Sequence, residues 1–219
     1  MNKRIFKYLV FLYLLIAYAI NASTNFNGAT GLIFIPTADA LKYKECNFGF
    51  DYILTSQEET RNWKYKVNMG IYENLELGFS GGKFPDEGVF VNLKYYLMST
   101  QERYPLKIAI GSESLTAKNA TNIYMISSKR FNPALAGHFG FNAMLDDKIE
   151  PGIMLGVSYF ITEIVELISD VHEQSNEYKI NLGATIHYNQ YATLKIALVD
   201  TLNLDEPQII VGIVHKNYL

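Results

Sequence analysis

The chain has little cysteine, little net charge of either sign and, after its first 22 residues, no long apolar run. A single cysteine, Cys46, excludes an internal disulfide among 219 residues. Beyond residue 22 no apolar run approaches the ~20 residues that a membrane-spanning helix requires. A membrane form of this protein would therefore have to span the bilayer with strands, because only helices and closed barrels pair all their backbone groups there.

The N-terminus has the layout of a secretory signal peptide. Lys3, Arg4 and Lys7 precede an apolar run, and Ala22 is a small residue before a cleavage point. We expect residues 1–22 to be removed on export. Removal takes three of the 19 basic residues and none of the 22 acidic ones, which leaves a formal net charge of −6. This acidic balance predicts no nucleic-acid partner.

Alternation with a period of two residues dominates the rest of the chain. In NWKYKVNMGIY (62–72), large apolar side chains alternate with Lys64, Lys66, Asn68 and Gly70. Successive side chains of a strand point to opposite faces, so this pattern predicts a strand with one apolar face. Twelve such segments follow one another, at 45–55, 62–72, 74–83, 87–97, 104–115, 120–130, 136–145, 150–161, 163–172, 177–188, 191–201 and 207–217.

The lengths of the segments and of their connections favour an outer-membrane barrel over a soluble sandwich. A tilted membrane strand needs ~9–11 residues, more than an ordinary globular strand. The connections EN, TE and NQ, after 62–72, 150–161 and 177–188, are very short, whereas those after the odd-numbered segments are longer and polar. Outer-membrane barrels sort short turns and longer loops to opposite ends in this way.

We therefore predict an all-β fold, a closed antiparallel transmembrane β-barrel of about 12 strands over residues 45–219. Its expected location is the outer membrane of a diderm bacterium, with outer-membrane lipid and, during insertion, the barrel-assembly machinery as partners. Aromatic residues at strand ends would form interfacial girdles, the alternative being the core of a sandwich. These residues are Tyr52, Tyr72, Tyr95, Tyr159 and Tyr188.

Charged residues of both signs share the polar phase that would face the lumen. We expect most of them to pair, because a buried charge without a partner is costly. Lys64 and Lys66 are predicted to pair with Asp51 and Glu76 on adjacent strands and to narrow the lumen. The alternative is a lumen that prefers anions, since rings of basic side chains select them. The predicted lumen-facing set is Asp51, Lys64, Lys66, Glu76, Lys94, Lys107, Glu166, Asp170, Lys179 and Lys195.

Two histidines in the lumen phase, His138 and His187, are the candidates for a barrel enzyme that modifies lipid or glycan. A hydrolase would need a serine within hydrogen-bond reach of the histidine and a third, orienting group. No local motif joins either histidine to the lumen-phase serines Ser80 and Ser158. The HE pair at 172–173 lacks a second histidine four residues on. We predict no catalytic residue, no metal site and no cofactor.

The stretch GATGLIFIPTADALKYKECNFGFDY (28–52) resembles the opening of the YjbH-like outer-membrane proteins. The positions that carry the resemblance are Gly31, Leu32, Pro36, Thr37 and Ala38. The resemblance implies a passive outer-membrane component associated with exopolysaccharide production, with polysaccharide or other envelope proteins as partners.

The N-terminal segment 23–44 has two interpretations. Proline in the middle of the segment argues against a central strand. The segment is either a strand-entry piece folded into the periplasmic mouth or a functional plug. The predicted function is a non-enzymatic barrel, serving surface polysaccharide export or assembly or acting as a narrow, porin-like solute pore. A barrel enzyme is the alternative.

Overall fold

The computed structural model describes residues 23–55, 62–83, 88–101, 103–117, 121–146, 148–174, 177–202 and 208–218, and the predicted signal peptide lies outside these ranges. Within them, no helix is long and apolar enough to cross a membrane. The strands are β1 (Glu45–Thr55), β2 (Asn62–Tyr72), β3 (Leu75–Gly82), β4 (Gly88–Ser99), β5 (Leu106–Glu113), β6 (Thr121–Arg130), β7 (Leu135–Leu145), β8 (Ile149–Phe160), β9 (Val165–Gln174), β10 (Glu177–His187), β11 (Ala192–Val199) and β12 (Gln208–Tyr218).

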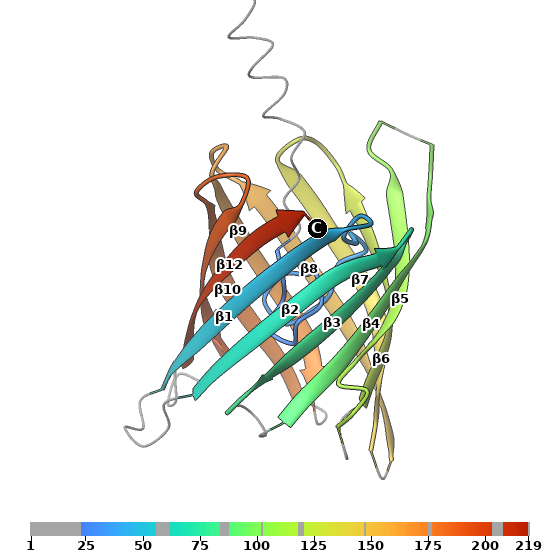
Figure 1. Cartoon of the computed structure of the whole chain (residues 1–219), viewed down its shortest axis with the longest axis vertical. Helices are drawn as coiled ribbons and strands as arrows, with labels where there is room; N and C mark the ends of the chain where they lie inside the picture. Colours follow the sequence, from blue (N-terminus) through green and yellow to red (C-terminus); the bar gives the residue numbers. More distant parts are fainter. Residues whose placement is uncertain are drawn as a thin grey trace, which may run out of the picture.

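The predicted fold is confirmed: the strands form one closed antiparallel barrel (Figure 1). Each strand pairs with its neighbours in sequence, and β12 pairs with β1 to close the sheet, from Glu45 opposite Tyr218 to Thr55 opposite Gln208. Every observed strand boundary lies within two residues of the predicted one. Closure leaves no unpaired sheet edge, which is the condition for a sheet that spans a bilayer.

The two faces of the sheet differ as the alternation predicts. Along β2 the side chains of Lys64, Lys66 and Asn68 are buried, whereas Ile71 is exposed. The outer face of the barrel carries exposed apolar side chains on most strands. They include Phe48, Phe50, Leu97, Ile123, Met125, Phe139, Phe141, Leu155, Leu167, Leu182, Ile196 and Ile213.

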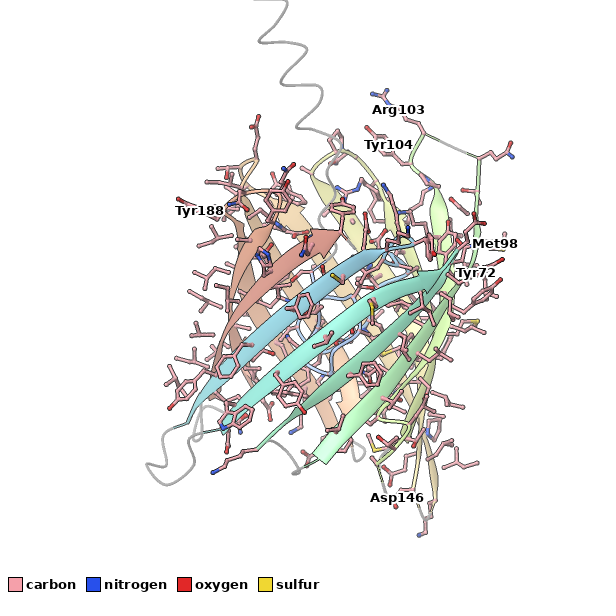
Figure 2. All side chains as sticks on the ribbon, viewed as in Figure 1. Tyr72, Met98, Arg103, Tyr104, Asp146 and Tyr188 are labelled. Carbon is pink, nitrogen blue, oxygen red and sulfur yellow. The ribbon has the colours of Figure 1, made fainter. Side chains whose placement is uncertain are left out.

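The predicted sorting of short turns and longer loops to opposite ends holds only in part, because β9 ends at Gln174 and β10 begins at Glu177, a connection as short as the one between β2 and β3 at the other end. The turn between β2 and β3 lies at the end of the barrel where β1 begins and β12 ends. Tyr72 and Tyr188 lie toward this end and Asp146 lies at the opposite one (Figure 2). The turn from β2 to β3 consists of two residues, and the second, Asn74, has φ 65°. Asparagine tolerates this left-handed conformation better than most residues, which favours the tight turn.

Candidate functional site

The N-terminal residues 23–41, which we call the plug, lie inside the barrel, where Figure 1 shows them as blue loops surrounded by the strands. The plug has its own backbone hydrogen bonds, from Phe26 N to Ile33 O (2.6 Å) and from Thr37 N to Thr30 O (3.0 Å). Its side chains are mostly buried. Residues 23–41 of segment 23–44 therefore occupy the lumen.

Glycines allow the plug to fold tightly and to approach the wall. Gly28 has φ +112°, a conformation that side-chain-bearing residues rarely adopt. A Cβ on Gly31 would meet the carbonyl oxygen of Ile35 and would lie 2.9 Å from the Cα of Pro36. On the wall, a Cβ on Gly156 would lie 2.6 Å from the plug's leucine and isoleucine side chains. The close fit therefore depends on missing side chains on both partners.

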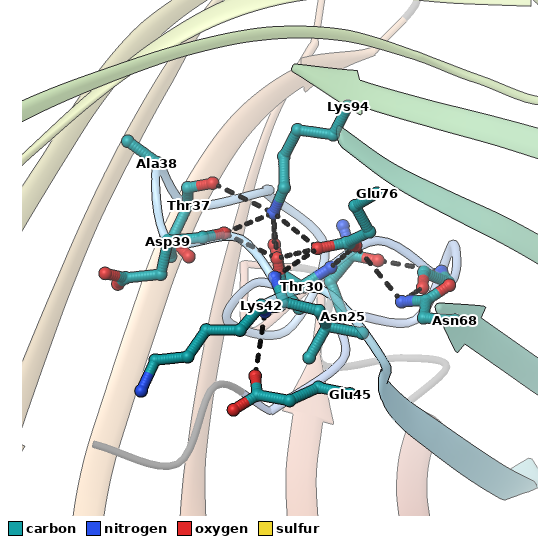
Figure 3. Close-up of polar contacts among 12 residues, drawn as sticks. Asn25, Thr30, Thr37, Ala38, Asp39, Lys42, Glu45, Asn68, Glu76 and Lys94 are labelled. Carbon is teal, nitrogen blue, oxygen red and sulfur yellow. Dashed lines mark hydrogen bonds and ion pairs between the residues drawn. The ribbon is translucent and has the colours of Figure 1, made fainter. Parts of the chain in front are cut away.

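Three buried lysines, one each from β2, β4 and β11, donate hydrogen bonds to main-chain carbonyl oxygens of the plug (Figure 3 shows those of Lys94). Each ammonium group has three donors, which lets one side chain hold several carbonyls. The acceptors are Asn25 O for Lys66 (3.0 Å), Thr30 O, Thr37 O and Asp39 O for Lys94 (3.1, 3.3 and 2.5 Å), and Thr24 O (2.6 Å) and Leu32 O for Lys195.

Two buried carboxylates accept hydrogen bonds from backbone N–H groups of the plug. Glu76 of β3 accepts from Thr30 N (2.9 Å) and Leu41 N (3.2 Å). Asp170 of β9 accepts from three consecutive N–H groups, those of residues 33, 34 and 35, at 2.8, 2.8 and 3.2 Å. Hydrogen bonds to a charged acceptor are about twice as strong as neutral ones, so these contacts hold the plug firmly.

A third carboxylate, Glu113 of β5, was not among the predicted lumen residues. It accepts hydrogen bonds from the side-chain amides of Asn25 (2.8 Å) and Asn27 (3.0 Å) of the plug. Glu113 is six residues from Lys107, on the same face of one strand, so the period of two residues was the signal that could have identified it.

The predicted lumen residues also form ion pairs, some of them deeply buried and others partly exposed. Lys66 pairs with Asp51, as expected, but Glu76 pairs with Lys94, while Lys64 lies over the Phe26 ring at 4.7 Å. The predicted pairing of Lys64 and Lys66 with Asp51 and Glu76 is therefore correct only for Lys66 with Asp51. Glu76 pairs with Lys94 instead, because the register of β3 and β4 places Lys94 directly opposite Glu76. The ion-pair distances are 2.6 Å for Lys66–Asp51, 3.4 Å for Lys94–Glu76, 2.5 Å for Lys107–Asp39, 3.5 Å for Lys179–Asp200 and 3.1 Å for His187–Glu166.

The pair Lys107–Asp39 joins the wall to the end of the plug where solvent still reaches both side chains, which are 31% and 27% exposed. Burial raises the pKa of the Asp39 carboxyl, but the Lys107 ammonium and other nearby cations lower it, and the net pKa lies below its ordinary value. This pair contributes stability above the unfolded-state pKa, and the contribution is lost as the pH falls through the folded-state pKa. An exposed pair of this kind contributes little, at most about 1 kcal/mol.

Apolar contacts hold the other side of the plug. Ile33 and Ile35 belong to one buried cluster with wall residues of β6, β8 and β9, namely Ile126, Met154 and Ile168. The interiors of outer-membrane barrels are usually polar, so this apolar patch on the inner wall matches the apolar side of the plug.

The residues that carried the family resemblance all lie in the plug. Gly31 and Pro36 form an isolated bridge, and Leu32 is buried. Thr37 accepts a hydrogen bond from Lys94 with its main-chain carbonyl oxygen, and Ala38 donates its N–H to the Ser128 hydroxyl (2.8 Å from N to Oγ). Their structural roles are thus turn formation and contact with the wall.

Both candidate catalytic histidines are buried and paired. His138 Nδ1 lies 2.7 Å from Ser128 Oγ, the same oxygen that accepts from the plug. His187 Nε2 lies 3.1 Å from a carboxylate oxygen of Glu166, and its ring stacks on Phe160. No group of three or more histidine, cysteine, aspartate or glutamate side chains among the described residues could hold a metal ion.

Solved structures similar to this chain include porins and another outer-membrane protein. A KdgM porin matches with a TM-score of 0.59 and 8% identity, over 77% of this chain and 98% of its own. A NanC porin matches with a TM-score of 0.53 and 12% identity, over 77% and 98%. The outer membrane protein Omp33 of Acinetobacter baumannii matches with a TM-score of 0.51 and 8% identity, over 82% and 100%. At these identities the likeness establishes the porin-like barrel fold.

No family model matches the sequence, and no curated protein matches it either. The resemblance to YjbH-like proteins is therefore wrong, since the structural neighbours are KdgM, NanC and Omp33. A motif of five positions, occupied by glycine, leucine, proline, threonine and alanine, reflects the local geometry of the plug and is too short to define a family. The exopolysaccharide association that rested on this resemblance loses its basis.

Proposed function

We propose that this chain is a non-enzymatic outer-membrane pore for small solutes, in which the plug narrows the lumen and limits conduction. The observation that carries the proposal is the plug itself, inside a porin-like barrel and held by buried charged groups of the wall. Charged groups that line a narrow channel select among the ions and polar solutes that pass through it.

The outer-membrane location is supported by the outer face of the barrel. Side chains such as Phe139, Phe141 and Leu155 are exposed there, on neighbouring strands. A soluble monomer rarely exposes an apolar surface of this extent. Tyr72 and Tyr188 near one rim suit the interface between lipid and water, where aromatic girdles form.

The proposal predicts that expelling the plug opens the pore. Ile35 is 1% exposed, and its backbone N lies 3.2 Å from the Asp170 carboxylate. In Ile35→Asp, a second carboxylate would be buried beside Asp170 without a partner, which strongly disfavours the docked plug. We expect single-channel conductance in planar bilayers to rise at least several-fold over the wild-type value.

The control is Tyr43→Asp, because Tyr43 is 57% exposed and lies between the plug and β1. Its conductance should equal that of the wild type. Both proteins must show the heat-modifiable gel band of a closed barrel. An Ile35→Asp barrel that is folded and conducts no more than wild type would exclude the plug as the limit on conduction.

The lysines of β2 predict a preference for anions. Lys64 and Lys66 face the interior, and Lys66 is balanced by Asp51 at 2.6 Å. In Lys64→Glu/Lys66→Glu, the two basic groups become acidic beside Asp51, so the reversal potential in a salt gradient should shift toward cation selectivity. An unchanged reversal potential in a folded double variant would contradict this assignment of the lumen charges.

An enzymatic role has weaker support from the geometry. A catalytic serine must be free to attack substrate, but the Ser128 hydroxyl beside His138 is occupied by the N–H of Ala38. The pair His187–Glu166 has no serine among its recorded hydrogen-bond partners within the described chain. Both groups are better explained as contacts that hold strands and plug together.

A further inference from the structure

The polar contacts between the wall and the plug are made mainly with main-chain atoms of the plug. Lys195 illustrates this, since its ammonium group contacts only the carbonyl oxygens of Thr24 and Leu32 among its recorded hydrogen bonds in the described chain. Asn68 and Asn92 also donate to plug carbonyls, those of residues 28 and 27. Every residue of a peptide offers such a carbonyl, so these contacts do not depend on which side chains the plug carries.

Two acceptors on the wall, Asp170 and Ser128, also bind main-chain atoms, whereas Glu113 is an exception that binds side-chain amides of the plug. Asp170 binds the N–H groups of residues 33–35 with one oxygen, and its other oxygen accepts from the Asn181 amide at 2.7 Å. Ser128 accepts the N–H of Ala38. Three successive N–H groups around one carboxylate form an anion-binding concavity of the peptide backbone. The wall thus presents donors for plug carbonyls on β2, β4 and β11 and acceptors for plug N–H groups on β3, β6 and β9.

The plug is covalently connected to β1 through exposed residues. Lys42, Tyr43 and Lys44 are exposed, and Lys44 N bonds to Gly70 O at the end of β2 (2.9 Å). This link begins β1 at the end of the barrel where β12 finishes. Recognition of the plug occurs inside the lumen, whereas its attachment to the wall lies at the rim, so the two can be separated.

We infer that the inner wall is a peptide-binding site that recognises the main chain of one looped segment, and that the plug is a separable ligand of this site. A free peptide of the same residues can therefore replace the plug. The inference goes beyond the proposed pore, because it would hold for a barrel that conducts nothing.

The test uses the full chain with a site-specific protease sequence inserted between Lys42 and Tyr43, or in parallel between Tyr43 and Lys44. The protein is folded in detergent, cut, and mixed with an excess of a fluorescent peptide of residues 23–42. Binding is measured by fluorescence anisotropy. The cut barrel should bind at least ten-fold more peptide than the uncut barrel. In the uncut barrel the tethered plug has a millimolar effective concentration and therefore outcompetes the free peptide.

Two variant peptides distinguish main-chain from side-chain recognition. Asp39→Asn should bind within about five-fold of the unmodified peptide, because among the described residues its carboxylate pairs with Lys107 alone, and that pair is partly exposed (31% and 27%). Gly31→Val should not bind, since its side chain would meet the Ile35 carbonyl. The barrel variant Lys195→Met should bind the unmodified peptide at least ten-fold more weakly.

Three results would overturn the inference. The cut barrel could lose its folded gel band, which would make the plug an inseparable part of the core. It could stay folded and take up no peptide, even in urea just below the unfolding transition. Asp39→Asn could impair binding as strongly as Gly31→Val, which would place recognition in the side chains. Because the assay reads binding and not current, its outcome is independent of the conductance experiment.

Discussion

Replacing Lys94 by methionine is expected to destabilise the folded barrel by about 3–5 kcal/mol, the usual cost of removing one partner of a buried ion pair. Lys94 is 1% exposed and pairs with Glu76 at 3.4 Å. It also donates to three plug carbonyls (Figure 3). Methionine matches the length of the lysine stem but leaves Glu76 without its cation and the three carbonyls without the ammonium donor.

The matched control is Lys107→Met, which removes the same chemical group from a half-exposed pair. It should cost at most about 1 kcal/mol. Urea unfolding in detergent, followed by the fluorescence of the single tryptophan, Trp63, measures both values. Equal midpoints for the two variants would show that the buried Lys94 contacts do not stabilise the barrel more than an exposed pair does.

Asp170→Asn is expected to weaken the plug and the barrel together, by about 2–4 kcal/mol, the cost of leaving one or more buried donors unsatisfied. One oxygen of Asp170 faces three plug N–H groups and the other faces the Asn181 amide. An asparagine amide must turn its own NH₂ toward one of these sets of donors. Asn181 is itself fixed, because its oxygen accepts from Asp200 N at 3.0 Å.

The control for this prediction is Asp200→Asn. Asp200 pairs with Lys179 at 3.5 Å, and both side chains are partly exposed. Asparagine also tolerates the φ of 52° at this position. Stability should change by at most about 1 kcal/mol, and conductance should not change. If Asp170→Asn is as stable as the control and conducts no more, the carboxylate does not hold the plug.

The sequence by itself determined the strands and their two faces. Side-chain alternation is a local property of an extended backbone, so NWKYKVNMGIY already identified Lys64 and Lys66 as members of one face. Alternation over twelve segments of similar length implied closure, because a bilayer leaves no other solution for a sheet.

Only the tertiary structure decided what fills the lumen and which charges meet. Whether segment 23–44 lies at the mouth or within the lumen depends on contacts between residues far apart in sequence, such as Ile33 N with Asp170, 137 positions away. The pairing of Glu76 with Lys94 depends on the register between β3 and β4. The sequence placed charges on the inner face, but it contained no signal for partners that are peptide groups, since every residue has an N–H or C=O to offer.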